Sequence, residues 1–445
     1  MGINGHNRQH WLALFLITAA TIVSITLGSN ARDEAAKDDG PVLDGFIKER
    51  NYSELARQLL SAKLVPSERD YFQGILDGRT NHPEHSAAEL EKILPKLKKT
   101  NAHRAAVALE TLAYDYFDLG RYPDASDTLS VLLKDFAVEL SSAAKQNITN
   151  DRNTFDLLRG APPQSISGAR NFKVAVQRDP INDIDVPIGV GGKTQWWIFD
   201  TGANLTTISR SSAKQLGLTL SKGHASTQSG ATGNQVSLST TVVPQLHFGS
   251  AVVHNVVSLV IDDKALDVDL GKNGHYRIQG ILGYPALAAL GSFTMSGNEM
   301  TVSPEAQPST GSAKLYIEGL TPLVEATVEG KELLFQFDTG QSAAELSVKY
   351  VRAFPQQFAS LKAVNAGIGG AGGVRSLTAY PLPKLILHLG TAAAIFSNVT
   401  AVSQDRGVYP QDEFFGNIGQ GLLQQFRTYT IDFSRMQLAL REHAQ

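Results

Sequence analysis

Two short stretches of this 445-residue chain decide its fold: Phe199-Asp200-Thr201-Gly202 and Phe337-Asp338-Thr339-Gly340. They lie 138 residues apart, and each follows an apolar, strand-like run that begins after a Gly-Lys pair, Gly192-Lys193 or Gly330-Lys331. A single Asp-Thr-Gly is an ordinary turn sequence, because Asp accepts backbone N–H bonds and Gly supplies positive φ. Two copies in register indicate an internal repeat.

Further markers repeat with nearly the same spacing. Gly230-Ala231-Thr232-Gly233 corresponds to Gly370-Ala371-Gly372-Gly373, and Ile281-Leu282-Gly283 corresponds more weakly to Asn417-Ile418-Gly419. Each copy closes with a strand-like tail, and short strands alternate with glycine-rich turns throughout. This pattern is typical of an all-β architecture. The sequence therefore predicts two copies of one β-fold, fused in tandem.

These residues resemble the aspartic proteases, both the two-lobed pepsin type and the retroviral type, over residues from about 170 to 445. Phe199 to Ala203 has the retroviral form of the motif, and Ile281-Leu282-Gly283 resembles the element that braces the catalytic loop in both types. The overall match is to bacterial retropepsin-like aspartyl proteases, here with two lobes. The resemblance implies a bilobal all-β fold and an aspartic-type endopeptidase, a hydrolase with no metal or other cofactor.

In that family the aspartates of the two loops form the catalytic dyad, and this role falls here on Asp200 and Asp338. The rest of each motif supports the dyad, since the threonines cross-brace the loops and the glycines let backbone approach the carboxylates. These supporting residues are Thr201, Gly202, Thr339 and Gly340.

Two glycine-rich segments are candidates for flaps that close over an extended peptide substrate. Plain flexible hairpin loops are the alternative interpretation. The candidate flap and substrate-binding residues are Gly230, Ala231, Gly233, Gly369, Gly370, Ala371 and Gly372.

Peptide hydrolysis without a metal or a covalent nucleophile needs an activated water. Two carboxylates held close together share one proton, because both cannot ionise comfortably. The ionised one takes a proton from water, and the protonated one hydrogen-bonds the scissile carbonyl. A pair of Asp-Thr-Gly loops supplies that arrangement.

One departure from the family pattern keeps a second interpretation open. Gln341 follows the second motif, where Ala203 follows the first. The alternative to an active enzyme is a catalytically weak or inactive peptide-binding protein that keeps the protease fold.

Composition excludes several other classes of protein. The chain has no cysteine, which removes disulfides, thiol catalysis and zinc ribbons. Its 40 basic and 43 acidic residues give a net charge of −3, which lacks the basic footprint of a nucleic-acid-binding protein. The sequence contains no His-Glu-x-x-His, phosphate-loop or Gly-x-Ser-x-Gly motif.

Apolar residues spaced three and four apart predict helices between about residue 40 and 160. One stretch resembles a tetratricopeptide-type (TPR-like) helical hairpin, with Gly120 near the turn and Ala125 where two helices cross. An ordinary helical bundle is the alternative. Either form indicates an interaction module for a protein partner or for the substrate.

Residues 11–28, WLALFLITAATIVSITLG, carry no formal charge and lie near the N-terminus. This length fits a cleaved signal peptide or a short membrane anchor. We therefore expect an exported, periplasmic or otherwise extracytoplasmic protein. The predicted organisation is a signal or anchor segment at 1–31, a helical domain at 32–160, and two protease lobes at 166–304 and 305–445.

Overall fold

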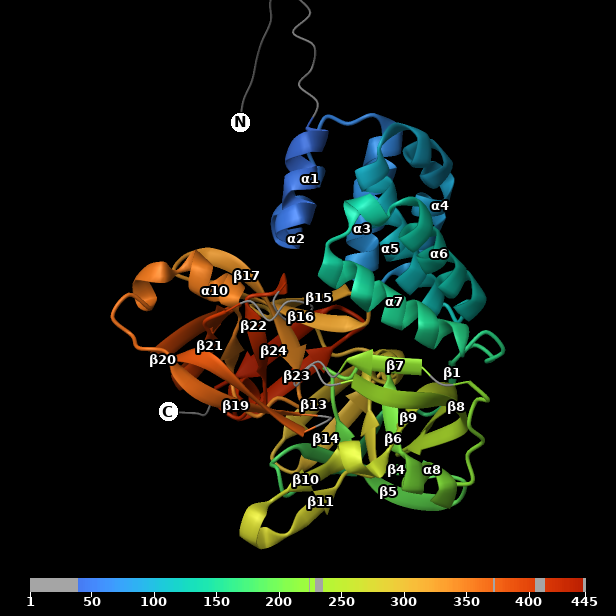
Figure 1. The fold of residues 1–445 in the computed structure, drawn as a ribbon, viewed down its shortest axis with the longest axis vertical. Coiled ribbons are helices and arrows are strands. Elements are labelled where there is room, and N and C mark those ends of the chain that lie inside the picture. The colour runs from blue at the N-terminus through green and yellow to red at the C-terminus, as the bar shows by residue number, and fades with distance from the viewer. Residues whose placement is uncertain (1–38, 224, 229–234, 371–372, 405–412, 443–445) are drawn as a thin grey trace, which may run out of the picture. The chain divides into compact units, whose positions relative to one another are not determined.

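The computed structural model describes residues 39–223, 225–228, 235–370, 373–404 and 413–442 (Figure 1). The predicted signal or anchor segment lies outside these residues. Across the described ranges, a helical region comes first and a β-rich region with four short α-helices follows, which agrees with the predicted fold class. The helices of the first region are α1 (Gly40–Glu49), α2 (Tyr52–Leu59), α3 (Pro66–Arg79), α4 (Pro83–Thr100), α5 (Ala102–Asp118), α6 (Tyr122–Asp135) and α7 (Ser142–Asp156).

Local sequence signals set the ends of these helices. Asn51, Asn101 and Ser141 each accept a hydrogen bond from a backbone N–H three residues ahead, and so cap α2, α5 and α7. Gly120 lies between α5 and α6 with a φ of 70°, a left-handed conformation that glycine adopts without strain. The predicted turn at Gly120 is therefore confirmed.

Each helix from α3 to α6 packs against the next one along the chain. A Cβ atom at Gly74 of α3 would lie 2.8 Å from Leu90 of α4, so glycine is needed for this close approach. Ala125 of α6 is fully buried. Within the described residues, no helix is long and apolar enough to cross a bilayer.

The β-rich region contains two lobes. The first lobe comprises β1 (Ser165–Gly168), β2 (Phe172–Ala175), β3 (Gln177–Arg178), β4 (Ile184–Val190), β5 (Lys193–Phe199), β6 (Thr206–Ser209), α8 (Arg210–Gln215), β7 (Ala225–Gln228), β8 (Gln235–Phe248), β9 (Ala251–Ile261), β10 (Asp267–Asp269), β11 (His275–Arg277), β12 (Gly280–Leu282), α9 (Tyr284–Leu290), β13 (Ser292–Ser296) and β14 (Glu299–Ser303). The second lobe comprises β15 (Ala313–Glu318), β16 (Thr321–Val328), β17 (Lys331–Asp338), β18 (Glu345–Leu346), α10 (Val348–Ala353), β19 (Val364–Gly370), β20 (Gly373–Leu389), β21 (Ala392–Val402), β22 (Gly416–Gly419), α11 (Gln420–Leu423), β23 (Thr428–Asp432) and β24 (Gln437–Arg441).

Both lobes have the same strand topology, which explains the sequence repeat. In the first lobe, β12 lies between β5 and β6, parallel to β5 and antiparallel to β6, and β6 pairs in parallel with β9. In the second lobe, β22 lies in the same way between β17 and β18, and β18 pairs in parallel with β21. Each lobe therefore has a loop after β5 or β17. A strand from later in the chain, β12 or β22, lies beside this loop, and we call it the inserted strand.

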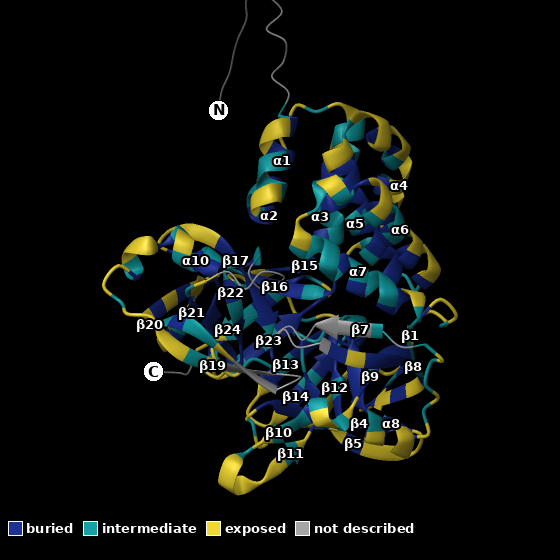
Figure 2. Cartoon of the chain, viewed as in Figure 1, coloured by how far each residue is buried: buried dark blue, intermediate teal, exposed yellow. Residues whose placement is uncertain are grey.

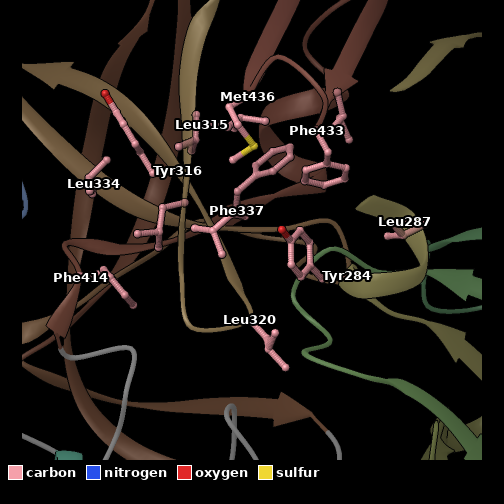
Figure 3. Close-up of a cluster of buried hydrophobic side chains, with 14 of the residues drawn as sticks. Tyr284, Leu287, Leu315, Tyr316, Leu320, Leu334, Phe337, Phe414, Phe433 and Met436 are labelled. Carbon is pink, nitrogen blue, oxygen red and sulfur yellow. The ribbon is translucent and has the colours of Figure 1, made fainter. Parts of the chain in front are cut away.

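A run of six strands, in the order β15-β24-β23-β13-β14-β2, joins the two lobes. At its centre the tail strands of the two copies pair with each other, so that Phe293 of β13 lies opposite Ile431 of β23. The Phe293 ring also packs against Phe199 and Phe433, at centroid distances of 4.9 and 6.4 Å. These side chains are buried. Figure 2 colours the chain by burial, and Figure 3 shows the adjoining cluster that includes Phe337 and Phe433.

A partly buried ion network links the helical region to the second lobe. Nε of Arg50 donates to both carboxylate oxygens of Glu318, at 2.9 and 2.8 Å, while its Nη2 contacts Glu413. The hydroxyl of Tyr52 donates to Glu318 at 2.8 Å. Burial raises the pKa of Glu318, but the guanidinium groups of Arg50 and Arg79 outweigh that effect and lower it to about 2. Glu318 is therefore ionised and bound to the helical region by charge.

Candidate active site

Asp200 and Asp338 lie at equivalent places in the two lobes. Asp200 follows β5 directly, and Asp338 is the last residue of β17. The inserted strands hold the backbone at both points. The N–H of Asp200 donates to the carbonyl of Leu282 at 3.1 Å, and Asp338 lies opposite Gly419 in the register of β17 and β22. Each aspartate therefore lies at a strand end whose backbone is paired with the inserted strand of the same lobe.

The two threonines bind the loops to each other. The hydroxyl of Thr201 donates to the carbonyl of Phe337 at 2.7 Å and accepts the N–H of Thr339 at 3.0 Å. The hydroxyl of Thr339 makes the mirror pair, donating to the carbonyl of Phe199 at 2.7 Å and accepting the N–H of Thr201 at 3.0 Å. Both threonines are fully buried. Four hydrogen bonds therefore fix the spacing of the two aspartates.

The glycines after the threonines are needed for close approach rather than for an unusual φ. A Cβ atom at Gly202 would lie 2.3 Å from Cγ of Asp338. A Cβ atom at Gly340 would lie 2.8 Å from Oδ2 of Asp200. Since real Cβ contacts are never that short, a side chain at either position would push the two carboxyl groups apart.

Backbone N–H groups bind the Oδ1 atoms of both carboxyl groups. Gly202 donates to Oδ1 of Asp200 at 2.8 Å. Gly340 donates to Oδ1 of Asp338 at 2.9 Å and to Oδ1 of Asp200 at 3.3 Å. One N–H therefore bridges the pair. Burial, and then the charge of Asp338, raises the pKa of Asp200 well above its usual range, as expected for carboxyl groups that share a proton.

A third carboxyl group, which the sequence did not single out, stands beside this pair. Asp183, just before β4, is 5% exposed. Burial, and then the charges of Asp179, Asp338 and Asp185, raises its pKa to about 8. The charge of Asp183 in turn raises the pKa of Asp200. The site is therefore more acidic than the two motifs alone indicate.

Asn417 is a second contact residue that sequence reasoning did not place at the site. Its Nδ2 donates to Oδ2 of Asp338 at 2.8 Å. The available signal was the weak second copy of the apolar-apolar-Gly element, in which Asn417 stands where the first copy has Ile281. That amide reaches the dyad because β22 lies directly beside β17.

The structure describes the two candidate flap hairpins only in part. In the first lobe β7 pairs with β8, up to Gln228 opposite Gln235, and Gly230, Ala231 and Gly233 lie outside the described residues. In the second lobe β19 pairs with β20, with Gly369 opposite Val374 and Gly370 opposite Gly373. Ala371 and Gly372 also lie outside the described residues. The hairpins occupy equivalent places in the two strand orders.

The larger residue after the second motif leaves the backbone contacts unchanged. The carbonyl of Gln341 accepts the N–H of Gln420 at 2.8 Å, and that of Ala203 accepts the N–H of Tyr284 at 2.9 Å. These are equivalent bonds, since each joins the motif loop to the start of α11 or α9. Gln341 therefore keeps the backbone bond that joins the motif loop to the following helix.

The helical region contacts the base of the first hairpin. Helix α7 packs against β7, and Leu157, just after α7, packs against the same apolar cluster as Ala225 of β7. A Cβ atom at Gly223 would lie 2.4 Å from the Leu157 side chain. The strand that leads to the first candidate flap therefore rests on the helical region.

Among the described residues, no group of three or more His, Asp or Glu side chains is arranged to hold a metal ion. Together with burial, the charges of the acidic residues at this site instead raise the pKa of Asp183 and of Asp200.

Comparison with known proteins gives the following matches. Residues 186–286, which run from β4 to α9 of the first lobe, match the family model described as aspartyl protease. Among solved structures, a retropepsin-like aspartic protease from Rickettsia conorii is 17% identical, with a TM-score of 0.23, covering 29% of this chain and 98% of that one. The search of curated proteins found no match.

Proposed function

We propose that this chain, whose first lobe matches the aspartyl protease family model, is an exported aspartic endopeptidase with one active site formed by both lobes. The observation that carries the proposal is the reciprocal bonding of Thr201 and Thr339, because it holds Asp200 and Asp338 around one shared N–H. A pair of ordinary turns would have no reason to be bonded to each other in this way.

The chemistry follows from one proton shared between two carboxyl groups. The carboxylate takes a proton from a water molecule, and the water oxygen attacks the carbonyl carbon of the scissile peptide bond. The carboxylic acid gives its proton to the carbonyl oxygen, so that a neutral tetrahedral diol forms. A proton then passes to the leaving nitrogen as the C–N bond breaks. The raised pKa of Asp200 supports a dyad that keeps one proton near neutral pH.

The proposed substrate is an extended peptide or protein segment that lies between the β7–β8 and β19–β20 hairpins. Two long hairpins at equivalent places in the two lobes support this arrangement. Strand edges offer backbone hydrogen bonds to an extended chain, and side-chain pockets then give specificity.

We propose further roles for the N-terminal parts of the chain. Residues 11–28 would direct export, either as a cleaved signal peptide or as a membrane anchor. The helical region would recruit a protein partner or the substrate, and its contact with β7 supports a position near the first hairpin.

The test is cleavage of a peptide library between pH 4 and 8 by the protein and by its Asp200→Asn and Asp338→Asn variants. The proposal predicts cleavage that both substitutions abolish and that a statine-type transition-state analogue blocks. Analogue binding without cleavage at any pH would favour the alternative, a peptide-binding protein with a protease fold. That alternative is motivated by Gln341, the larger side chain in the second lobe.

A further inference from the structure

The two lobes differ at the point where the inserted strand meets the dyad. In the first lobe Ile281 of β12 lies opposite Ile198 of β5, and in the second lobe Asn417 of β22 lies opposite Gln336 of β17. These positions are equivalent in the repeat. The apolar side chain of Ile281 has no hydrogen bond to offer, whereas Nδ2 of Asn417 donates to Oδ2 of Asp338 at 2.8 Å.

This difference makes the two carboxyl groups unequal as hydrogen-bond acceptors. Asp338 receives an N–H at each oxygen, from Gly340 at Oδ1 and from Asn417 at Oδ2. Asp200 receives Gly202 and Gly340 at the same atom, Oδ1. Within the described part of the chain, Oδ2 of Asp200 meets no backbone or amide donor. A carboxylate is favoured where both oxygens accept, and the oxygen without a donor is the natural place for a proton.

The orientation of the Asn417 amide and the ionisation of Asp338 depend on each other. With Nδ2 turned to Asp338, Oδ1 of Asn417 is buried and accepts no hydrogen bond within the described residues. A buried acceptor without a partner is costly. The opposite orientation would set the amide oxygen against Oδ2 of Asp338, which is favourable only if that oxygen carries a proton.

The charge of Asp183 does not distinguish the two carboxyl groups, because Asp183 interacts with both Asp200 and Asp338. Asp183 faces the pair from the segment before β4; burial and the charges of Asp179, Asp338 and Asp185 raise its pKa, and Arg178 lowers it. The inserted strands β12 and β22 contain no charged residue. The charges of Asp338 and Asp183, together with burial, raise the pKa of Asp200.

We propose that Asn417 is a positioning residue that sets the polarity of the dyad, with Asp338 as the carboxylate that activates water and Asp200 as the acid that protonates the carbonyl oxygen. This inference rests on the proposed endopeptidase function. In the first step Asp338 gains the proton of the water and Asp200 loses its own, so the pair still holds one proton. In the second step Asp338 gives its proton to the leaving nitrogen, and Asp200 recovers one from the diol as the C–N bond breaks.

The test is a titration that does not depend on cleavage. The full-length protein is labelled with ¹³C at the aspartate carboxyl carbons, and Asp338 is identified by its loss in the Asp338→Asn variant. In the unsubstituted dyad Asp338 is expected to ionise at lower pH than Asp200. In the Asp200→Asn background, where Asp338 titrates without its partner, Asn417→Leu is expected to raise the pKa of Asp338 by about one to two pH units, the size of one charge-assisted hydrogen bond.

Leucine has the same number and branching of side-chain heavy atoms as asparagine, and retention of the remaining ¹³C shifts shows that the variant is folded. Ionisation of Asp200 before Asp338 would overturn the inference, as would an Asp338 pKa that Asn417→Leu leaves unchanged. If the enzyme cleaves peptides, Asn417→Leu should also move the acidic limb of kcat/KM to higher pH by a similar amount. Absence of cleavage together with the expected titration would contradict the endopeptidase function alone.

Discussion

Replacing Thr201 by valine tests how the two lobes hold the dyad. Valine has almost the same volume as threonine, so the substitution removes a hydroxyl without opening a cavity. That hydroxyl bonds the carbonyl of Phe337 at 2.7 Å and the N–H of Thr339 at 3.0 Å, and the site is fully buried. Thr201→Val therefore leaves two buried backbone groups without partners.

The expected cost follows from those two groups. A buried polar group that loses its partner costs about 1–3 kcal/mol, so Thr201→Val should lower the free energy of unfolding by roughly 2–6 kcal/mol. Thr201→Ser keeps both bonds and loses one methyl group, at a cost of about 1 kcal/mol. The valine variant should also lose activity, because the spacing of Asp200 and Asp338 is no longer fixed.

Guanidinium unfolding, followed by circular dichroism, measures these differences. Thr207→Val is the matched control, because that hydroxyl is also buried but makes a single local bond, to the carbonyl of Leu205 at 3.1 Å. It should cost about 1 kcal/mol. The Thr201→Val, Thr339→Val double variant should cost less than the sum of its parts, because the loops are already released by the first substitution. A Thr201→Val cost no larger than that of Thr207→Val would refute the reasoning.

Three other expectations follow from contacts outside the threonine pair. Glu318→Gln should lower the free energy of unfolding by about 2–3 kcal/mol in a urea titration, because it removes charge-assisted hydrogen bonds at a partly buried site. Glu305→Gln, which breaks an exposed pair, should cost at most about 1 kcal/mol. Folding favours the neutral form of Asp183, so its contribution to stability falls as pH rises from about 4 towards its pKa of about 8. The fall is at most about 1.4 kcal/mol per pH unit. The unfolding midpoint of the Asp183→Asn variant should therefore depend less steeply on pH. Leu157→Ala should speed amide hydrogen exchange in β7 by about ten-fold, while exchange at Asp200 stays slow. Equal exchange rates in β7 of the variant and the unsubstituted protein would show that the helical region does not support this strand.

Much of the β-fold could be predicted because the sequence contains two copies of the same pattern. The constant spacing of the two Asp-Thr-Gly motifs reflects equivalent strands, β5 and β17, each followed by a loop that an inserted strand crosses. The helices could be predicted as well, since apolar spacing and the glycine at position 120 act over short distances. These are local signals, and local signals are what a single sequence carries best.

The remaining features depend on contacts between residues far apart in the chain. Asn417 reaches Asp338 across 79 positions, and Arg50 reaches Glu318 across 268. The Arg50–Glu318 pair has no sequence motif, and the motifs that contain Asn417 and Asp338 do not show that the two side chains meet, because both contacts form only after the strands and helices have packed. Asp183 was also missed, since its raised pKa comes from burial and from neighbours that the fold assembles.

The most direct test of the account is whether the two aspartates act as one unit. With the best peptide from the library, kcat/KM is measured for the Asp200→Asn variant, the Asp338→Asn variant and the double variant. Each single substitution should lower kcat/KM by at least about a hundred-fold, and the double variant should be no slower than the slower single one, because a shared-proton pair fails when either member is lost. A single variant that keeps full activity, or losses that multiply independently in the double variant, would contradict a dyad formed by Asp200 and Asp338.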